Sequence, residues 1–277
     1  MQERGRTYPA RKSALIRCSA CRSVEGRIRE KICIDKVQCV QECVKKDTAC
    51  FKLEKIRVGV MRSSNIKAVI FDMDGVLIDT EKHYNAAWCE AARMAGFDFK
   101  REHALMLRSC DAQLAAKMMK DIFGAGFDYF AIREVRRRLV AERLEKYGLE
   151  KKPGIDEILA FLHEKCIKAA VATATPIELT LQHLEKIGVR DQFDKIVSAK
   201  QVEHGKPAPD VYLYACAQIG EEPADCIAVE DSPNGIRSAY AAGCKPVMVP
   251  DLTQPDEELL SLLYAVADTL WDIRRFV

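Results

Sequence analysis

The sequence contains no long apolar run. Apolar residues make up 48% of its 277 residues, but none of the runs reaches the roughly 18 residues that predict a membrane-spanning helix. No apolar segment of the signal-peptide kind opens the chain. We therefore expect a cytoplasmic protein without a membrane partner, and the apolar content is ample for a sizeable core.

The chain also lacks a strong overall charge. A formal net charge of +2 gives no bulk attraction to nucleic acid, so no nucleic-acid partner is expected for the core. The average hides an asymmetry, because residues 1–61 hold 15 Lys+Arg and 7 Asp+Glu, a net of +8, whereas residues 62–277 hold 28 and 34, a net of −6. The change of sign predicts a boundary near Met61.

The twelve cysteines form no regular zinc or disulfide pattern. Six lie in residues 1–61, with a single C-x-x-C pair at Cys18 and Cys21 and no matching second pair. The other six lie singly in apolar surroundings, which fits a reducing compartment and predicts no disulfide framework. These six are Cys89, Cys110, Cys166, Cys216, Cys226 and Cys244.

Three interpretations of the basic, Cys-rich leader at residues 1–61 stay open. It is an artefact of too early a start site, with Met61 the true start, or a metal- or nucleic-acid-binding appendage, or an organellar transit segment. The acidic residues spread through it argue against a transit segment. We favour the start-site artefact, with a disordered or locally helical tail as the next alternative.

From Ile66 onward, strand-like and helix-like patterns alternate. Short apolar, β-branched runs predict strands, and longer stretches with helical spacing predict helices. The expected strands are residues 67–71, 167–173, 193–198, 226–230 and 245–249, and the expected helices between and after them include 155–164, 177–188, 209–220 and 233–243. This alternation predicts an α/β fold, a Rossmann-like parallel sheet flanked by helices.

Proline is missing from residues 80–149, which show helical spacing and no strand pattern. Pro153-Gly154 then breaks the pattern. We expect an inserted all-helical cap domain at 80–149 and an α/β core made of 62–79 and 150–277. The aromatic residues of the insert are expected to pack inside it; they are Trp88, Phe127, Tyr129 and Phe130.

Polar residues follow three of the expected strands. They are Asp72-Met73-Asp74, Thr173-Ala174-Thr175 and Glu230-Asp231-Ser232, and Lys206 precedes the helix after the third strand. In open parallel sheets, ligands bind outside the carboxyl ends of the strands. We therefore expect these acids, hydroxyls and the lysine to converge on one rim.

The acids suit metal-assisted phosphoryl transfer. Asp72 and Asp231 can each supply a carboxylate oxygen to Mg²⁺, which prefers oxygen ligands and offsets their mutual repulsion. Asp72 can attack phosphorus to give an aspartyl-phosphate. Asp74 lies on the same side of an extended chain and can protonate the leaving oxygen, then deprotonate the hydrolytic water.

The remaining groups suit the phosphate itself. Lys206 supplies a positive charge, and the Thr173 hydroxyl supplies a hydrogen-bond donor. Backbone N–H groups nearby, among which we count that of Ala174, add further donors. A small phosphorylated compound is therefore the expected partner.

The sequence resembles the haloacid dehalogenase-like hydrolase superfamily, in its phosphatase and phosphomutase branch. Four motifs in family order carry the resemblance over roughly residues 64–250: "DMDGVLIDTE", "VATAT", "GKPAPD" and "VEDSPNGIRSAYAAG". The resemblance implies that Asp72 is the nucleophile and Asp74 the general acid/base, with Thr173 and Lys206 as phosphate binders. It also implies a helical cap that closes over the site and selects the substrate.

The resemblance further implies a magnesium site at Glu230 and Asp231. Asp72 shares that site, and Asp74 contacts the metal through its backbone carbonyl. The aspartate at the second position of the first motif argues against a dehalogenase or a phosphonatase, which differ there.

Two departures from the family pattern favour a phosphatase over a sugar phosphomutase. A mutase holds two phosphates and commonly carries a basic residue after the second-motif hydroxyls, where this chain has Pro176. The cap loop, which usually contains glycine, reads Arg108-Ser109-Cys110-Asp111, although Arg108 could still reach a phosphate.

We therefore expect a Mg²⁺-dependent, monomeric phosphatase of sugar phosphates that acts through an aspartyl-phosphate. A β-phosphoglucomutase-like phosphomutase is the alternative. A non-catalytic binding protein is the alternative of another class, and the presence of Asp72, Asp74, Lys206 and Asp231 argues against it.

Three other residues are ambiguous. His83 and Tyr84 begin the first helix of the insert and either face the substrate or lie on the helix surface. Asn234 either hydrogen-bonds near the fourth-motif carboxylates or helps to begin its helix.

Overall fold

The structure is a computed structural model that describes residues 66–277. The leader, residues 1–61, lies outside the described residues, so its interpretations stay predictions. None of the helices between residues 66 and 277 combines the length and the apolar content that crossing a membrane requires.

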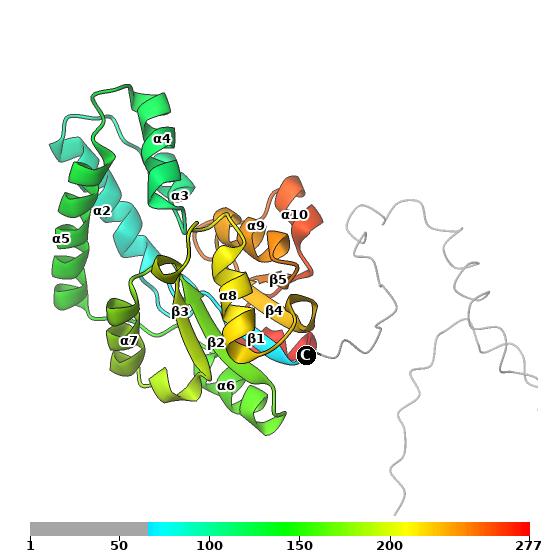
Figure 1. The fold of residues 1–277 in the computed structure, drawn as a ribbon. Coiled ribbons are helices and arrows are strands. Elements are labelled where there is room, and N and C mark those ends of the chain that lie inside the picture. The colour runs from blue at the N-terminus through cyan, green and yellow to red at the C-terminus, as the bar shows by residue number, and fades with distance from the viewer. Residues whose placement is uncertain (1–65) are drawn as a thin grey trace, which may run out of the picture. The chain divides into compact units, whose positions relative to one another are not determined.

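Six parallel strands form one sheet in the order β3-β2-β1-β4-β5-β6 (Figure 1). The strands are β1 (Ala68–Phe71), β2 (Lys168–Thr173), β3 (Lys195–Ser198), β4 (Cys226–Glu230), β5 (Lys245–Met248) and β6 (Ala265–Val266). The expected α/β fold with a parallel sheet is confirmed. The sequence did not predict β6, whose two residues are too few to show a pattern.

Apolar layers cover both faces of the sheet, because successive side chains of a strand point to opposite faces. In β1, Val69 and Phe71 join the cluster that contains α6, whereas Ala68 and Ile70 join the cluster that contains α8. Both faces are buried, which explains the continuous apolar runs in the sequence. In Figure 1, α8 lies in front of the strands.

Five helices accompany the strands in the α/β part of residues 66–277, and the first four agree with the helices expected from the sequence. They are α6 (Ile155–Glu164), α7 (Ile177–Lys186), α8 (Asp210–Ile219), α9 (Pro233–Ala241) and α10 (Glu257–Leu262). The same part contains four short 3₁₀ helices, which are η2 (Arg190–Gln192), η3 (Ala199–Gln201), η4 (Pro223–Asp225) and η5 (Leu270–Arg275).

Four further helices, which we call the cap helices, lie between β1 and α6 in the chain. They are α2 (Glu81–Met94), α3 (Arg101–Met106), α4 (Ala112–Phe123) and α5 (Tyr129–Tyr147). The carboxylates of Asp111 and Asp128 cap the N-termini of α4 and α5. The cap helices share a buried cluster of their own, although the exact domain boundaries at 79 and 150 stay a prediction.

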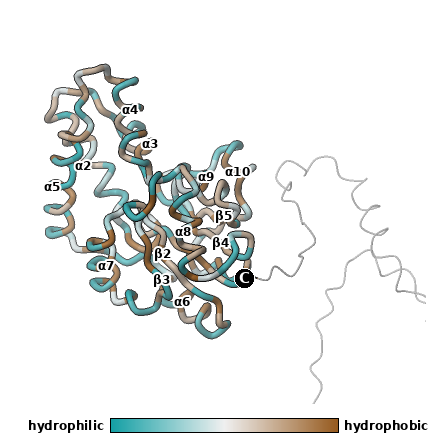
Figure 2. Tube along the Cα trace, in the orientation of Figure 1, coloured by the Kyte–Doolittle hydropathy of each residue, from teal (hydrophilic) through white to brown (hydrophobic). Residues whose placement is uncertain are grey.

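The expectation for the aromatic residues of the insert holds for three of the four. Trp88, Phe127 and Tyr129 are buried in the cluster of the cap helices, but Phe130 is 44% exposed, so its expected burial was wrong. Successive residues of a helix point about 100° apart, and Tyr129 takes the inward direction. Figure 2 shows that the strands are mainly hydrophobic, whereas α5 is largely hydrophilic.

Candidate active site

The residues that follow β1, β2 and β4 meet at one edge of the sheet. β1 lies between β2 and β4, with Phe71 opposite both Val171 and Val229. Asp72, the next residue, donates its backbone N–H to the carbonyl of Val229 at 2.9 Å. Because all three strands are parallel, their carboxyl ends lie side by side, as the sequence predicted.

Three buried carboxylates form the centre of the site. Asp72, Glu230 and Asp231 each offer a carboxylate oxygen, and these atoms lie within 4.8 Å of one another. All three residues are at most 1% exposed. Like charges this close repel one another, and burial removes the water that would screen them. The cluster therefore needs positive charge beside it.

Lys206 supplies part of that charge. Its fully buried Nζ donates to Asp72 Oδ1 at 2.9 Å, to Glu230 Oε1 at 2.7 Å and to the carbonyl of Ala172 at 3.0 Å. Burial alone would lower the pKa of Lys206, but the two carboxylates raise it. The ammonium group therefore stays charged and holds the predicted nucleophile in place.

The ionised forms of two carboxylates remain disfavoured in spite of Lys206. Burial raises the pKa of Asp72 to about 7, while Lys206 opposes the shift. Burial also raises the pKa of Asp231 well above its ordinary value, while Arg108 opposes that shift. A nearby divalent cation would favour the ionised forms of both groups.

The donor set fits Mg²⁺. All three groups are oxygen ligands, the type this ion prefers. Asp231 Oδ1 is buried and has no hydrogen-bond partner among residues 66–277, a costly arrangement that a cation would relieve. Gly75 has φ +83°, and any side chain at this position would collide with the Asp231 carboxylate. This glycine lets the loop after β1 come close to the acids; the part of the Asp74 carbonyl in the site stays a prediction.

Two hydroxyl groups hold the carboxylate of Asp74. Thr80 Oγ1 donates to its Oδ1 at 2.6 Å, and Thr175 Oγ1 donates to its Oδ2 at 2.7 Å. Both oxygens of the carboxylate are therefore fixed in direction. Sequence reasoning placed Asp74 and Thr175 on this rim but gave Thr175 no role of its own. It missed Thr80, although this threonine lies inside the first motif.

Arg108 reaches the acid cluster from the cap side. Its guanidinium pairs with the carboxylate of Asp231, and its Nε lies 3.3 Å from Glu81 Oε2. Burial raises the pKa of Glu81 to about 8 in spite of this arginine. The sequence predicted Arg108 as a substrate contact, whereas the structure places it against a candidate metal ligand. Glu81 was missed, and its only signal is its position at the end of the first motif.

Hydrogen bonds tie the cap loop, which in the structure comprises residues 107–111 between α3 and α4, to the core. Asn234 on α9 donates its side-chain amide to the carbonyls of Met106 and Arg108 at 3.2 and 2.9 Å. The backbone N–H of Asp111 donates to the carbonyl of Lys206 at 2.7 Å. The amide of Asn234 thus binds the loop from the core side, a role that neither expectation for this residue included.

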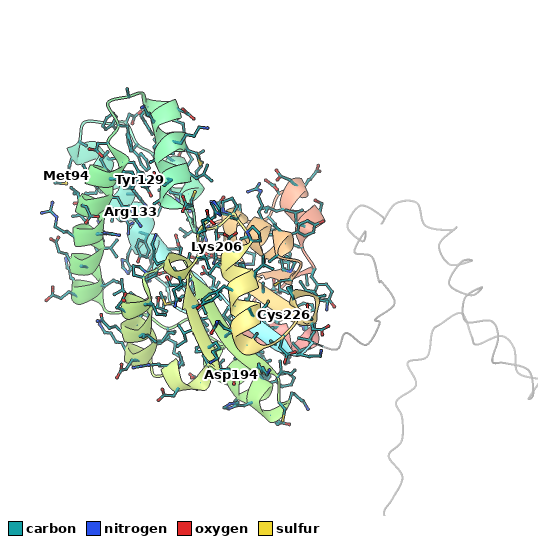
Figure 3. The ribbon with its side chains drawn as sticks, viewed as in Figure 1. Met94, Tyr129, Arg133, Asp194, Lys206 and Cys226 are labelled. Atoms are coloured by element: carbon teal, nitrogen blue, oxygen red, sulfur yellow. The ribbon has the colours of Figure 1, made fainter. Side chains whose placement is uncertain are left out.

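One cavity of about 680 Å³ joins the cap helices and the core. This volume lies within the range of about 300–1,000 Å³ that is usual for small-molecule sites. The predicted residues that line it are Asp72, Asp74, Tyr84, Arg108, Thr173, Ala174 and Lys206. Figure 3 labels Lys206 on the core and Tyr129 and Arg133 on α5, and these three also line the cavity.

The two neighbouring candidates on α2, His83 and Tyr84, differ in whether they line the cavity. Tyr84 lines the cavity, and its hydroxyl lies beside Thr175. His83 stacks on Tyr147 with 5.8 Å between the ring centroids and does not line the cavity. The structure therefore brings Tyr84 to the site and leaves His83 outside it.

Known proteins with similar sequences point to one family. A family described as haloacid dehalogenase-like hydrolase matches residues 69–249. Hexitol phosphatase B of Escherichia coli (strain K12) is 32% identical over 189 residues, which cover 67% of this chain and 84% of that protein. Phosphorylated carbohydrates phosphatase of Thermotoga maritima is 31% identical over 186 residues, which cover 66% and 84%.

Solved structures show the same fold. CbbY from Rhodobacter sphaeroides in complex with phosphate has 25% identity and a TM-score of 0.62, over 75% of this chain and 96% of that chain. A β-phosphoglucomutase from Clostridium difficile has 23% identity and a TM-score of 0.64, over 75% and 93%. The second likeness is too distant in sequence to carry more than the fold.

Proposed function

The chain belongs to the haloacid dehalogenase-like hydrolase family, and from this premise we propose that it is a Mg²⁺-dependent phosphatase of small phosphorylated sugars. One observation carries the proposal. At the edge of the cavity, a buried Lys206 holds Asp72 beside two further carboxylates that fit a metal, while Asp74 stands next to them with both oxygens held by threonines.

The residues divide the two steps of hydrolysis between them. A carboxylate oxygen of Asp72 forms a bond to phosphorus while the bond from phosphorus to the sugar oxygen breaks, and Asp74 gives that oxygen a proton. A water molecule then attacks the phosphorus of the aspartyl-phosphate, Asp74 takes its proton, and the Asp72 carboxylate is released. Asp72, Glu230 and Asp231 would hold Mg²⁺, which neutralises charge on the carboxylates and on the phosphate when bound.

Three groups would hold the phosphate during these steps. The Thr173 hydroxyl and the backbone N–H of Ala174 are donors that line the cavity beside Asp72. Lys206 adds its positive charge, while its three N–H groups are engaged by Asp72, Glu230 and the carbonyl of Ala172. Donors fixed in a water-poor site stabilise the charge of the transition state without having to reorganise.

The relatives favour a phosphatase over a phosphomutase. The two relatives at 31–32% identity are named as phosphatases of hexitols and of phosphorylated carbohydrates, whereas the β-phosphoglucomutase shows the fold alone. Pro176 lines the cavity at the position where a mutase commonly has a basic residue. We therefore keep the phosphomutase as the alternative, and a binding protein without activity as the alternative of another class.

Release of inorganic phosphate tests the proposal. The purified protein is incubated with a panel of sugar and hexitol monophosphates, first with a chelator and then with excess Mg²⁺. We expect turnover only with Mg²⁺, together with a higher melting temperature, because a ligand that binds the folded state stabilises it. Full activity and unchanged melting in the chelator would refute the metal dependence, and no phosphate release under any condition would favour the binding protein.

A further inference from the structure

The cap side of the cavity carries positive charges that the proposed mechanism does not use. Arg133, Arg136 and Arg137 on α5 line the cavity, as does Lys200 of the core. Arg137 pairs with Glu134 at 2.6 Å. Within residues 66–277, the other three form no ion pair with a carboxylate. Cations that gather without counterions repel one another, which is unfavourable unless a bound anion compensates.

Arg136 is the most enclosed of these cations. Its guanidinium lies 5.0 Å from the ring centroids of both Tyr84 and Trp88, and its buried Nε has no hydrogen-bond partner among the described residues. Burial lowers the pKa of Arg136, and the nearby charge of Arg133 lowers it further. The two rings hold the guanidinium in place, but they offer no acceptor for its N–H groups.

Lys200 is an exposed residue whose side chain lines the same cavity. Burial and the charge of Arg133 lower its pKa, and Asp111 is the carboxylate whose charge opposes them. Packing of Arg136 between two aromatic rings would explain a single arginine, but it leaves unexplained why two more unpaired cations converge on the same cavity. An anion that binds in the cavity would account for all three.

Tyr84 connects this group of cations to the reacting end of the cavity. Its ring contacts Arg136, and its hydroxyl lies beside Thr175, which in turn donates to Asp74 at 2.7 Å. The length of one tyrosine side chain therefore separates Arg136 from the threonine that holds the general acid. A sugar is of comparable length, so the two ends of one sugar derivative can reach both places.

We propose that Arg133, Arg136 and Lys200 bind a second anionic group at the far end of the substrate. The substrate class is then a doubly anionic sugar derivative, such as a sugar bisphosphate or a phosphorylated sugar acid. The planar fork of an arginine can bind either a phosphate or a carboxylate through two parallel hydrogen bonds. The inference rests on the proposed function and narrows its substrate class; it places the second anion on α5 rather than near Pro176.

Calorimetric binding to an Asp72→Asn protein in Mg²⁺ tests the second site without turnover. The three ligands are glucose 6-phosphate, whose far end is neutral, 6-phosphogluconate, which ends in a carboxylate, and fructose 1,6-bisphosphate. We expect at least one of the doubly anionic ligands to bind about tenfold more tightly than glucose 6-phosphate, because hydrogen bonds between charged groups are the strong ones.

An additional Arg136→Met substitution should remove that advantage. Methionine keeps an apolar side chain between the two rings, so the loss should be about tenfold for the doubly anionic ligand and less than about threefold for glucose 6-phosphate. Arg138→Met is the matched control, since Arg138 lies on the same helix, is exposed and does not line the cavity. If Arg136→Met does not fold, Arg133→Met provides the same comparison.

Two results would overturn the inference. One is equal affinity for all three ligands, and the other is a loss on Arg136→Met that is the same for each of them. Wild-type turnover of the same compounds is measured separately. If the wild type releases phosphate from none of them while the binding pattern is as expected, the proposed function fails and the anion site stands.

Discussion

At the scale of single residues, the surroundings of Asp72 disfavour its ionised form when no metal is bound. A nucleophilic carboxylate must be ionised, yet burial beside Glu230 and Asp231 favours its protonated form. Lys206 offsets only part of this, because it is shared between Asp72 and Glu230. The same crowding that strains the metal-free protein is what prepares the site for a cation.

Replacing Asp72 with asparagine should separate catalysis from stability. The amide cannot attack phosphorus, so we expect kcat to fall by about a thousandfold or more. It also removes one of the mutually repelling charges, so the melting temperature in a chelator should not decrease. Retention of more than about a thousandth of the wild-type rate would remove Asp72 from the role of nucleophile.

The raised pKa of Asp72 also predicts how stability depends on pH. A carboxyl whose pKa rises from 3.8 in the unfolded chain to about 7 in the metal-free fold binds more protons when folded. Its stabilising contribution is therefore present below about pH 4 and is lost as the pH rises through about 7. Glu81 and Asp231, whose pKa values are also raised, act in the same direction.

We therefore expect the metal-free protein to melt about 5 °C lower at pH 8 than at pH 5, since each kcal/mol shifts the melting temperature by about 2–4 °C in a domain of this size. Differential scanning calorimetry in a chelator measures this. The difference should shrink with Mg²⁺ and in Asp72→Asn. Melting that is higher at pH 8 in the chelator would contradict the assignment of these buried acids.

At the scale of elements, the strands and the motifs at their ends were predictable because both are local in sequence. Asp72 follows β1 directly, and Glu230 and Asp231 stand at the end of β4, so a parallel sheet alone brings them together. Residues contributed by helices were harder. His83 and Tyr84 are neighbours, and only the packing of α2 against α5 decides which of them lines the cavity.

Dependence on tertiary packing also explains why the sequence did not predict Arg136 as a cavity residue or the partners of Asn234. Arg136 becomes a cavity residue only because α5 packs beside α2. Likewise, β6 and α10 are short and lie at the edge of the sheet or outside it, so their residues show neither a strand nor a helix period. Asn234 lies inside the fourth motif, but its partners, the carbonyls of Met106 and Arg108, come 128 and 126 residues earlier in the chain.

The cap loop gives a prediction at this scale. Asn234→Ala removes two hydrogen bonds to the carbonyls of Met106 and Arg108, together worth about 2 kcal/mol. We expect faster hydrogen exchange in residues 107–111 and a KM raised about three- to tenfold, because Arg108 is held less firmly. Ser261→Ala on α10 is the control, and unchanged exchange in the cap loop would show that other contacts hold it.

At the scale of the whole molecule, hydrolysis and phosphoryl transfer within a sugar give different products. We expect inorganic phosphate from sugar phosphates, because the chain has Pro176 at the position after the second-motif hydroxyls where a mutase commonly carries a basic residue. Nuclear magnetic resonance of phosphorus distinguishes the two outcomes. Conversion of glucose 1-phosphate to glucose 6-phosphate, with a bisphosphate activator and little free phosphate, would establish the phosphomutase instead.

The leader gives a second prediction for the whole chain. All predicted catalytic residues follow Ile66, and the charge changes sign near Met61. A protein that starts at Met61 should therefore fold, bind Mg²⁺ and turn over substrate within about twofold of the full chain, since a basic segment with few aromatic residues adds little apolar burial. Side-by-side calorimetry and kinetics measure this, and an insoluble or inactive shortened protein would show that the boundary is wrong.

The place of β1 in the sheet has a consequence for synthesis on the ribosome. Its two neighbours, β2 and β4, begin at Lys168 and Cys226, so β1 and the Asp72 that follows it are translated long before either of them. At about 5–20 residues per second, β4 follows β1 by roughly 10–30 seconds. During that interval Asp72 has neither Glu230 nor Asp231 beside it. The nascent chain therefore carries the predicted nucleophile as an isolated aspartate, and the acidic site forms only when the last fifth of the protein emerges.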